Sequence, residues 1–206
     1  MVIVVSSPDA IHDEQQNIVK LFAEGLSILH LRKKNHTEHQ LRRFIESIPA
    51  QYYQLITLHS HYHLVAEYGL RGIHIPYAYT GAVISGKPVS ISFHSTEEIG
   101  SASRQFEYGF ISPVFDSISK QGYNGRFDLD ELSQFLCNRN ERILALGGID
   151  EDNIERLRGK GFSGVALLGA VWQSDNPVAK FKRIKAKWDA STYTQPRSCP
   201  KINDLI

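Results

Sequence analysis

Short apolar runs rich in valine, isoleucine and leucine recur along this chain, and most are followed by a longer segment with helical spacing. This alternation predicts βα units around a parallel sheet. Strands are expected at Val2–Ser6, Ser27–Leu31, Leu55–Leu58, Gly72–Ile75, Val89–Ser92, Tyr108–Ser112, Ile143–Leu146 and Gly164–Leu168. Helices are expected at Asp13–Glu24, Glu38–Ile48, Tyr62–Tyr68, Thr96–Gln105, Leu129–Leu136, Asp150–Lys160 and Pro177–Trp188. Eight alternations favour an α/β fold that is a single (β/α)8 TIM barrel of eight parallel strands, with an open doubly wound sheet as the alternative.

Length and composition predict one soluble domain. The 206 residues fit a barrel over residues 1–188 followed by a C-terminal tail over 189–206, which has two prolines and no clear period. With 23 basic and 22 acidic residues, neither nucleic acid nor a membrane is expected as a partner. Cys137 and Cys199 lie far apart, so no disulfide framework is implied and a cytoplasmic location is expected. A homo-oligomer is left open.

The second strand combines apolar and basic residues in alternation. Leu29 and Leu31 are predicted to face one way, toward the helix layer, and His30, Arg32 and Lys34 the other. The polar series would climb the barrel interior toward the C-terminal mouth, where enzymes of this architecture keep their sites.

Histidines recur at the same end of other strands. His59 closes the third strand, His74 alternates with isoleucines in the fourth, and Ser92 and His94 alternate with apolar residues in the fifth. Four histidines from four strands predict a lined pocket at the mouth. His30, His59 and His94 are the candidate proton carriers, and His74 and Ser92 are candidate substrate contacts.

Two features predict a phosphate site. The loop after the sixth strand carries Ser117, Ser119 and Lys120 near glycines, and hydroxyls with an ammonium group can wrap an anion. The seventh strand is followed by Gly147 and Gly148, and the eighth ends at Leu168 before Gly169 and Ala170. Small residues at these two strand ends match the common phosphate site of such barrels.

A series of short motifs resembles the thiamine-phosphate synthase and TenI superfamily from about Ser27 to Ala170. In chain order the motifs are Leu29-His30-Leu31-Arg32-Lys33-Lys34, Gly72-Ile73-His74-Ile75-Pro76, Ser92-Phe93-His94-Ser95, Ser112-Pro113-Val114-Phe115 and Leu146-Gly147-Gly148-Ile149. The resemblance implies that a thiazole phosphate is held by Ser117, Ser119 and Lys120 with backbone near Gly148, Leu168 and Gly169. In synthases the equivalents of Arg32 and Lys34 bind the pyrophosphate of a pyrimidine substrate, and magnesium is required.

The sequence departs from the synthases at the positions that hold magnesium. The Asn-Asp pair expected after the third strand is His59-Ser60, and the acidic residue expected after the fourth strand falls at or near Tyr79. Pro76 looks like the TenI branch, whose active members isomerise a carboxythiazole phosphate without a metal. However, the TenI histidine just after the sixth strand is replaced by Pro113.

The leading hypothesis is therefore a TenI-like thiazole tautomerase with no metal, in which His30, His59 or His94 carries the proton. A divergent thiamine-phosphate synthase is the alternative, and it would need magnesium and the pyrimidine pyrophosphate. A sensor that binds thiamin-related phosphates without turnover is a third hypothesis. A fourth, a metal hydrolase, is suggested by the HxHxH run of His59, His61 and His63.

Overall fold

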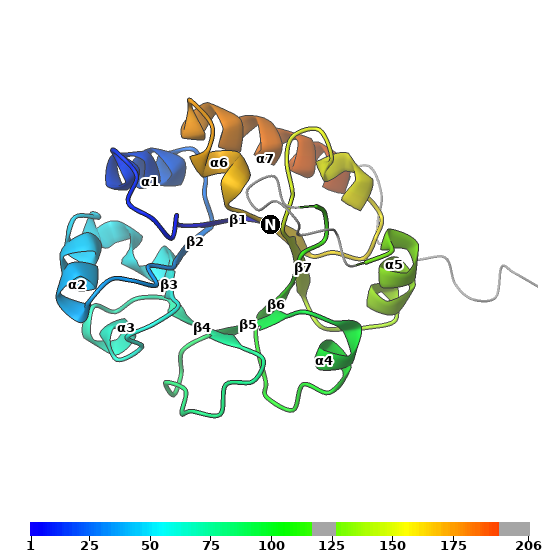
Figure 1. The fold of residues 1–206 in the computed structure, drawn as a ribbon, viewed down its shortest axis with the longest axis horizontal. Helices are drawn as coiled ribbons and strands as arrows, with labels where there is room; N and C mark the ends of the chain where they lie inside the picture. Colours follow the sequence, from blue (N-terminus) through cyan, green and yellow to red (C-terminus); the bar gives the residue numbers. More distant parts are fainter. Residues whose placement is uncertain (117–126, 194–206) are drawn as a thin grey trace, which may run out of the picture.

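The structure, a computed structural model, describes residues 1–116 and 127–193. Eight parallel strands close into a barrel in chain order, with β8 pairing with β1 (Figure 1). The strands are β1 (Val2–Val5), β2 (Ile28–Leu31), β3 (Ile56–Leu58), β4 (Gly72–Pro76), β5 (Val89–Phe93), β6 (Tyr108–Ile111), β7 (Ile143–Leu146) and β8 (Gly164–Leu167). The predicted barrel is confirmed, and every strand bound agrees to within one residue.

Helices surround the barrel. They are α1 (Glu14–Ala23), α2 (Glu38–Glu46), α3 (Leu64–Glu67), α4 (Thr96–Gly100), α5 (Leu129–Cys137), α6 (Gly169–Trp172) and α7 (Pro177–Tyr193), with 3-10 turns η1 (Ala50–Leu55) and η2 (Ile154–Leu157). The helix predicted over Asp150–Lys160 is reduced to η2. Asn153 bonds the backbone of Asp150 and of Gly148 and holds a turn where the first helical turn would form. The last helix runs to Tyr193, beyond the predicted boundary at Trp188, and residues 194–206 lie outside the described part of the chain.

The sheet separates two apolar layers. Outside it, Leu29, Leu31, Ile91 and Phe93 pack with the helices in the larger cluster of buried residues. Inside it, Ile3, Val5, Ile28, Tyr108, Phe110, Leu144 and Ala166 form a smaller one. The alternation expected for β2 and β5 is thus confirmed, and it directs the intervening polar residues into the barrel.

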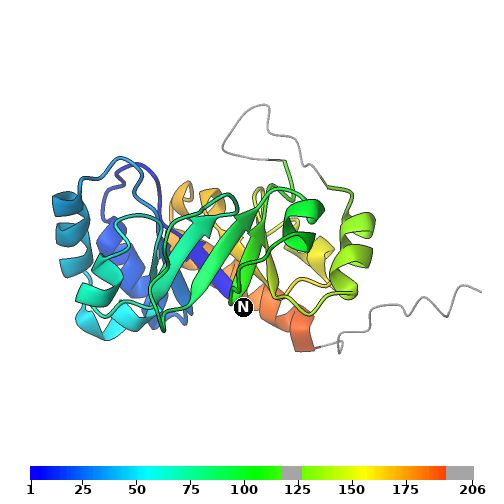
Figure 2. The ribbon, with the colours of Figure 1, turned by 90° about the horizontal axis from the view of Figure 1, so that it is seen from below.

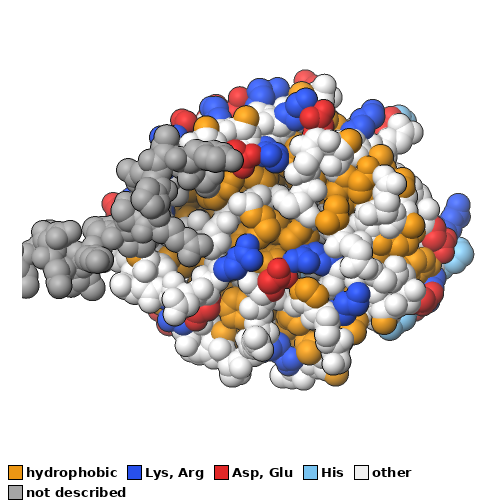
Figure 3. All heavy atoms as spheres, turned by 180° about the vertical axis from the view of Figure 1, so that it is seen from behind, with side chains coloured by type: hydrophobic (Ala, Val, Ile, Leu, Met, Phe, Trp, Pro, Cys, Tyr) orange, Lys and Arg blue, Asp and Glu red, His pale blue; other side chains and the backbone are white. Residues whose placement is uncertain are grey.

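The two ends of the barrel differ. Seen from the side, the strands end at one face of the molecule and Met1 lies at the other (Figure 2). At the centre of the face where the strands begin, basic and acidic side chains gather (Figure 3). Arg71 and Glu107 directly precede β4 and β6 at this end of the barrel, and the Arg71 guanidinium bonds both carboxylate oxygens of Glu107, at 2.6 and 2.7 Å. This ion pair lies beneath the interior, which leaves the opposite, C-terminal face as the mouth.

The structure also shows the state of one cysteine and the character of the helices. Cys137, the last residue of α5, is disulfide-bonded. The sequence did not indicate this disulfide, because the separation of two cysteines along the chain does not give their distance in space. Cys199 lies outside the described residues. Within the described part of the chain, no helix has both the length and the apolar character needed to cross a membrane.

Candidate functional site

Three of the nine histidines meet inside the barrel. His30 on β2 is fully buried, and its Nδ1 lies 2.9 Å from Nε2 of His59, the residue directly after β3. On its other side, Nε2 of His30 lies 2.7 Å from the Tyr108 hydroxyl on β6. Tyr108, His30 and His59 therefore form a hydrogen-bonded column that rises from the interior toward the mouth; we refer to these three residues as the histidine column.

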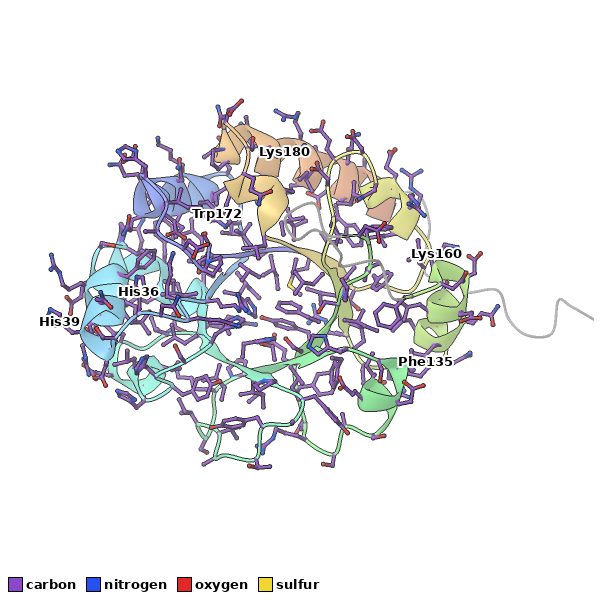
Figure 4. All side chains as sticks on the ribbon, in the orientation of Figure 1. His36, His39, Phe135, Lys160, Trp172 and Lys180 are labelled. Carbon is purple, nitrogen blue, oxygen red and sulfur yellow. The ribbon has the colours of Figure 1, made fainter. Side chains whose placement is uncertain are left out.

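His74 on β4 stands beside the column. Its ring stacks on that of His59, with centroids 4.3 Å apart, and both its nitrogens bond serines on β5: Ser90 at 2.9 Å and Ser92 at 2.7 Å. The strand register explains this contact, because His74 is the partner of Ser90. Side chains from the strands fill the ring, whereas His36 and His39 lie out at α2 (Figure 4).

Burial controls the charge of this cluster. It lowers the pKa of His30 and of His59 well below the ordinary histidine value, and the neighbouring His74 adds to both shifts. It lowers the pKa of His74 to about 3, with the Arg32 guanidinium as a second cause. All three imidazoles are therefore neutral at physiological pH, because their surroundings disfavour the charged form.

The cluster fits a metal poorly. One nitrogen from each of His30, His59 and His74 lies within 4.8 Å of the others, which is a donor set for transition metals and not for magnesium. However, both nitrogens of His30 and of His74 already bond protein groups. The nearly parallel rings of His59 and His74, 25° apart, also do not direct their lone pairs at one point.

Magnesium has no carboxylates at the positions where the synthases hold it. The ends of β3 and β4 carry His59-Ser60 and Pro76 to Tyr79, and the Tyr79 hydroxyl donates to the Ala82 carbonyl at 3.1 Å. These groups do not form the hard oxygen site that this ion prefers. The HxHxH run also does not converge, since His63 turns outward to Glu38 at 3.3 Å while His59 faces the interior.

His94 occupies a separate and more accessible place. It follows β5 and is exposed, and its Nδ1 donates to the Ser112 carbonyl at the end of β6, at 3.0 Å. The backbone N–H of His94 donates to the Glu98 carboxylate at 2.6 Å. The carbonyl bond places the proton of the neutral ring on Nδ1, so Nε2 carries the lone pair. The four histidines expected on one rim thus divide into an interior group of three, of which His59 is half-buried, and one at the surface of the mouth.

The basic residues after β2 also divide. Arg32 is half-buried, its N–H donates to the Ser6 hydroxyl at 2.8 Å, and its charge acts on His59 and His74. Lys34 is exposed at the mouth. Between them, Lys33 is buried in the helix layer, where it pairs with Glu14 and donates to the Ser7 carbonyl at 2.8 Å.

The glycines after β7 have a packing role. Gly147 and Gly148 adopt left-handed conformations, with φ of 97° and 65°. A Cβ on Gly147 would lie 2.8 Å from Pro113, and one on Gly148 would overlap the Asp116 carbonyl. Phe115 N–H donates to the Gly147 carbonyl at 3.1 Å. The loops after β6 and β7 are thus held together at the mouth.

The remaining predicted phosphate contacts are partly described. Leu168 and Gly169 follow β8, and α6 begins at Gly169, so its first amides lie at the C-terminal end of the strand. Ser117, Ser119 and Lys120 lie outside the described residues. The sequence reading missed Tyr108 as a polar partner of His30, although its alternation with Gly109 in β6 indicates an inward side chain.

Comparison with known proteins places the chain among thiamine-synthesis proteins. The profile of the family described as thiamine monophosphate synthase matches residues 1–171. A thiamine-phosphate synthase of Neisseria gonorrhoeae is 25% identical over 82% of this chain and 88% of its own length. One from Prochlorococcus marinus is 26% identical over 79% of this chain, which spans only 50% of that longer relative. A solved thiamine phosphate pyrophosphorylase from Bacteroides thetaiotaomicron has 32% identity and a TM-score of 0.78, over 91% of this chain and 97% of that one.

Proposed function

The chain belongs to the thiamine monophosphate synthase family, and we propose that it acts on thiazole phosphate at the barrel mouth as a TenI-type tautomerase, with His94 as the proton carrier. The observation that carries this proposal is the bond from His94 Nδ1 to the Ser112 carbonyl. It sets the imidazole beside Pro113, which stands where TenI proteins have their histidine. A histidine from β5 would thus serve in the place of one lost after β6.

The chemistry requires one group that takes a proton from the substrate and returns it at another atom, so that the ring becomes aromatic. His94 Nε2 carries a lone pair toward solvent, and the positive ring formed on proton uptake would be hydrated and stabilised by the Ser112 carbonyl. His30 and His59 are poor bases, because burial lowers the pKa of each well below the ordinary histidine value. Of the three candidate proton carriers, His94 is the best suited.

The phosphate would be held by the cations after β2 and the backbone at the ends of β7 and β8. Arg32 and Lys34 supply positive charge at the mouth, and the amides near Gly148 and Gly169 supply hydrogen-bond donors. Ser117, Ser119 and Lys120 are proposed to complete this site from the loop that follows Asp116.

The test is the interconversion of carboxythiazole phosphate tautomers by single variants. His94→Gln is expected to lower turnover by about 100-fold or more, the usual contribution of a general base. His39→Gln, which changes an exposed histidine on α2, is the matched control and should retain full activity. Turnover within about threefold of the unaltered protein in His94→Gln would refute the assignment. Binding of thiazole phosphate without turnover by the unaltered protein would favour the sensor instead.

A synthase is the second candidate, because the relatives from Neisseria gonorrhoeae and Prochlorococcus marinus are named thiamine-phosphate synthase and the solved Bacteroides protein is named thiamine phosphate pyrophosphorylase. Arg32 and Lys34 keep the positions at which synthases bind pyrophosphate. The ends of β3 and β4 lack carboxylates for magnesium, so no step is assigned to that ion here. Release of pyrophosphate on mixing the protein with thiazole phosphate, pyrimidine pyrophosphate and magnesium would establish this activity, and its absence at high protein concentration would exclude it.

A further inference from the structure

One nitrogen of the interior cluster is open to a ligand. Of the six ring nitrogens of His30, His59 and His74, five bond to described residues, and the sixth, His59 Nδ1, has no partner among them. It is also absent from the fully buried, unpartnered side-chain atoms of residues 1–116 and 127–193, so it is exposed to solvent. Because His59 follows β3 at its C-terminal end, this accessible nitrogen lies at the floor of the mouth.

The histidine column has two neutral arrangements. In the first, the Tyr108 hydroxyl donates to His30 Nε2 and His30 Nδ1–H donates to His59 Nε2, so His59 carries its proton on Nδ1. In the second, His59 Nε2–H donates to His30 Nδ1 and His30 Nε2–H donates to Tyr108, so His59 Nδ1 carries a lone pair. The tautomers of His30 and His59 therefore change together, and each arrangement satisfies every nitrogen below the floor.

Protonation of His30 or His59 is not an alternative to this change of tautomer. Arg32 lies on the mouth side of the cluster and acts on His59 and His74, and Arg71 acts on His30 from the opposite end. The carboxylate nearest to Arg71, Glu107, is already paired with it. An imidazolium in the column would meet positive charge from both ends, so the floor presents either an N–H or a lone pair while it stays neutral.

We propose that His59 Nδ1 binds the ring nitrogen of a heteroaromatic ligand, and that the tautomer of the histidine column decides whether it donates to that nitrogen or accepts from it. The inference rests on the proposed function for the identity of the ligand. A ring nitrogen that carries a lone pair, as in a thiazole, would be bound by the Nδ1–H form, and a ring nitrogen that carries a proton by the other form, so the tautomer of the histidine column sets which rings the floor accepts. His59 would thus be a positioning and specificity residue, separate from the proton carrier His94.

The experiment is NMR of the full chain with histidine labelled by the heavy nitrogen isotope, since nitrogen shifts distinguish N–H from lone-pair nitrogens. Signals are assigned with His30→Gln and His59→Gln. Two probes are added in turn: methylthiazole, whose ring nitrogen accepts, and methylthiazolone, whose ring nitrogen donates. Methylthiazole is expected to favour the Nδ1–H form of both His30 and His59, and methylthiazolone the Nε2–H form of both, with the tautomer ratio differing by at least about threefold between the two probes.

Tyr108→Phe removes the hydroxyl that closes the column. We expect it to change the ratio of affinities for the two probes by at least about fivefold, because both tautomers of His30 lose their partner at Nε2 and a buried unpaired N–H differs in cost from a buried unpaired lone pair. Tyr62→Phe is the matched control. It removes a hydroxyl that donates to the His74 carbonyl at 3.0 Å, outside the column, and should leave the ratio unchanged.

Several results would overturn the inference: a charged His30 or His59 at pH 7, a His59 signal that neither probe moves, or the same tautomer with both probes. The readout needs no turnover, so its failure is distinguishable from failure of the proposed function. If His94→Gln abolishes turnover but His59 ignores the probes, only the ring contact is refuted. If the column responds but His94→Gln stays active, only the assignment of His94 is refuted.

Discussion

Lowering the pH from 7.5 to 5 should destabilise this protein through its buried histidines. In the unfolded chain a histidine has a pKa of about 6.5 and takes up a proton in this range. In the folded chain His74 stays neutral, because burial lowers its pKa to about 3. The unfolded state then binds more protons, so stability is fully present above the unfolded pKa and is lost as the pH falls from about 6.5 toward 3.

The size of the loss follows from the two pKa values. For His74 alone, the free energy of unfolding should fall by about 2 kcal/mol between pH 7.5 and 5. His30 and His59 act in the same direction, because burial lowers the pKa of each as well. Glu14 opposes them, since burial raises the pKa of its carboxyl and its protonation favours the folded state as the pH falls. Three histidines outweigh one glutamate, and the net loss is large beside a typical total of about 5–15 kcal/mol.

Urea unfolding followed by circular dichroism at several pH values measures this loss. Between pH 6 and 5 the free energy of unfolding should fall by more than about 1.4 kcal/mol per pH unit, which corresponds to more than one proton. His74→Gln should lower the slope by about one proton whatever its effect on absolute stability, and His39→Gln should leave the slope unchanged, because His39 is exposed. A free energy that stays constant to about 0.5 kcal/mol from pH 7.5 to 5 would refute the reasoning.

Three substitutions test the framework around the site by urea midpoint. Gly148→Ala should lower the free energy of unfolding by more than about 2 kcal/mol, because the added Cβ would overlap the Asp116 carbonyl at a φ of 65°. Gly86→Ala, at a φ of 72° in open space, should lower it by about 1 kcal/mol. Equal losses for the two variants would contradict this account. Lys33→Met should cost about 3–5 kcal/mol by leaving the Glu14 carboxylate buried without its cation, and adding Glu14→Gln should recover part of that cost, whereas no recovery would show that the charge is not the cause. Thr37→Ala should cost about 1 kcal/mol by removing the capping box of α2, and an unchanged midpoint would mean that the cap does not contribute.

The fold could be predicted from the sequence because the strand and helix periodicities both indicate the same barrel. Apolar runs with a period of two and helical segments with a period near 3.6 alternate eight times, and a parallel barrel satisfies both. The failures lie where side chains override that pattern. At Asp150 the Asn153 side chain forms a local turn, which composition alone does not distinguish from a helix start. The short helix α6 has only four residues and directly follows a strand, so it is too short to show a helical period in the sequence.

The site could be predicted only in part from the sequence, because the alternation of residues along a strand tells which face of the sheet a side chain lies on and not how deeply it is buried. That alternation placed His30, His74 and Ser92 inside the barrel, but it gave no reason to separate them from His94. Depth decides their chemistry, since a fully buried imidazole stays neutral and an exposed one is hydrated. The pairing of Lys33 with Glu14 was also unreadable, because it joins the loop after β2 to the start of α1 across 19 residues of sequence.

Depth also explains why ring recognition and proton transfer would fall to different histidines. Each imidazole added to the interior lowers the pKa of its neighbours, because burial and mutual repulsion act together. A cluster of three therefore cannot supply a strong base at neutral pH, however close it lies to a substrate. It can supply neutral hydrogen-bonding groups, which would suit contact with a substrate ring. We propose that the proton is carried instead by a histidine outside the cluster, and His94, directly after the neighbouring strand, is bonded to one carbonyl and open to water.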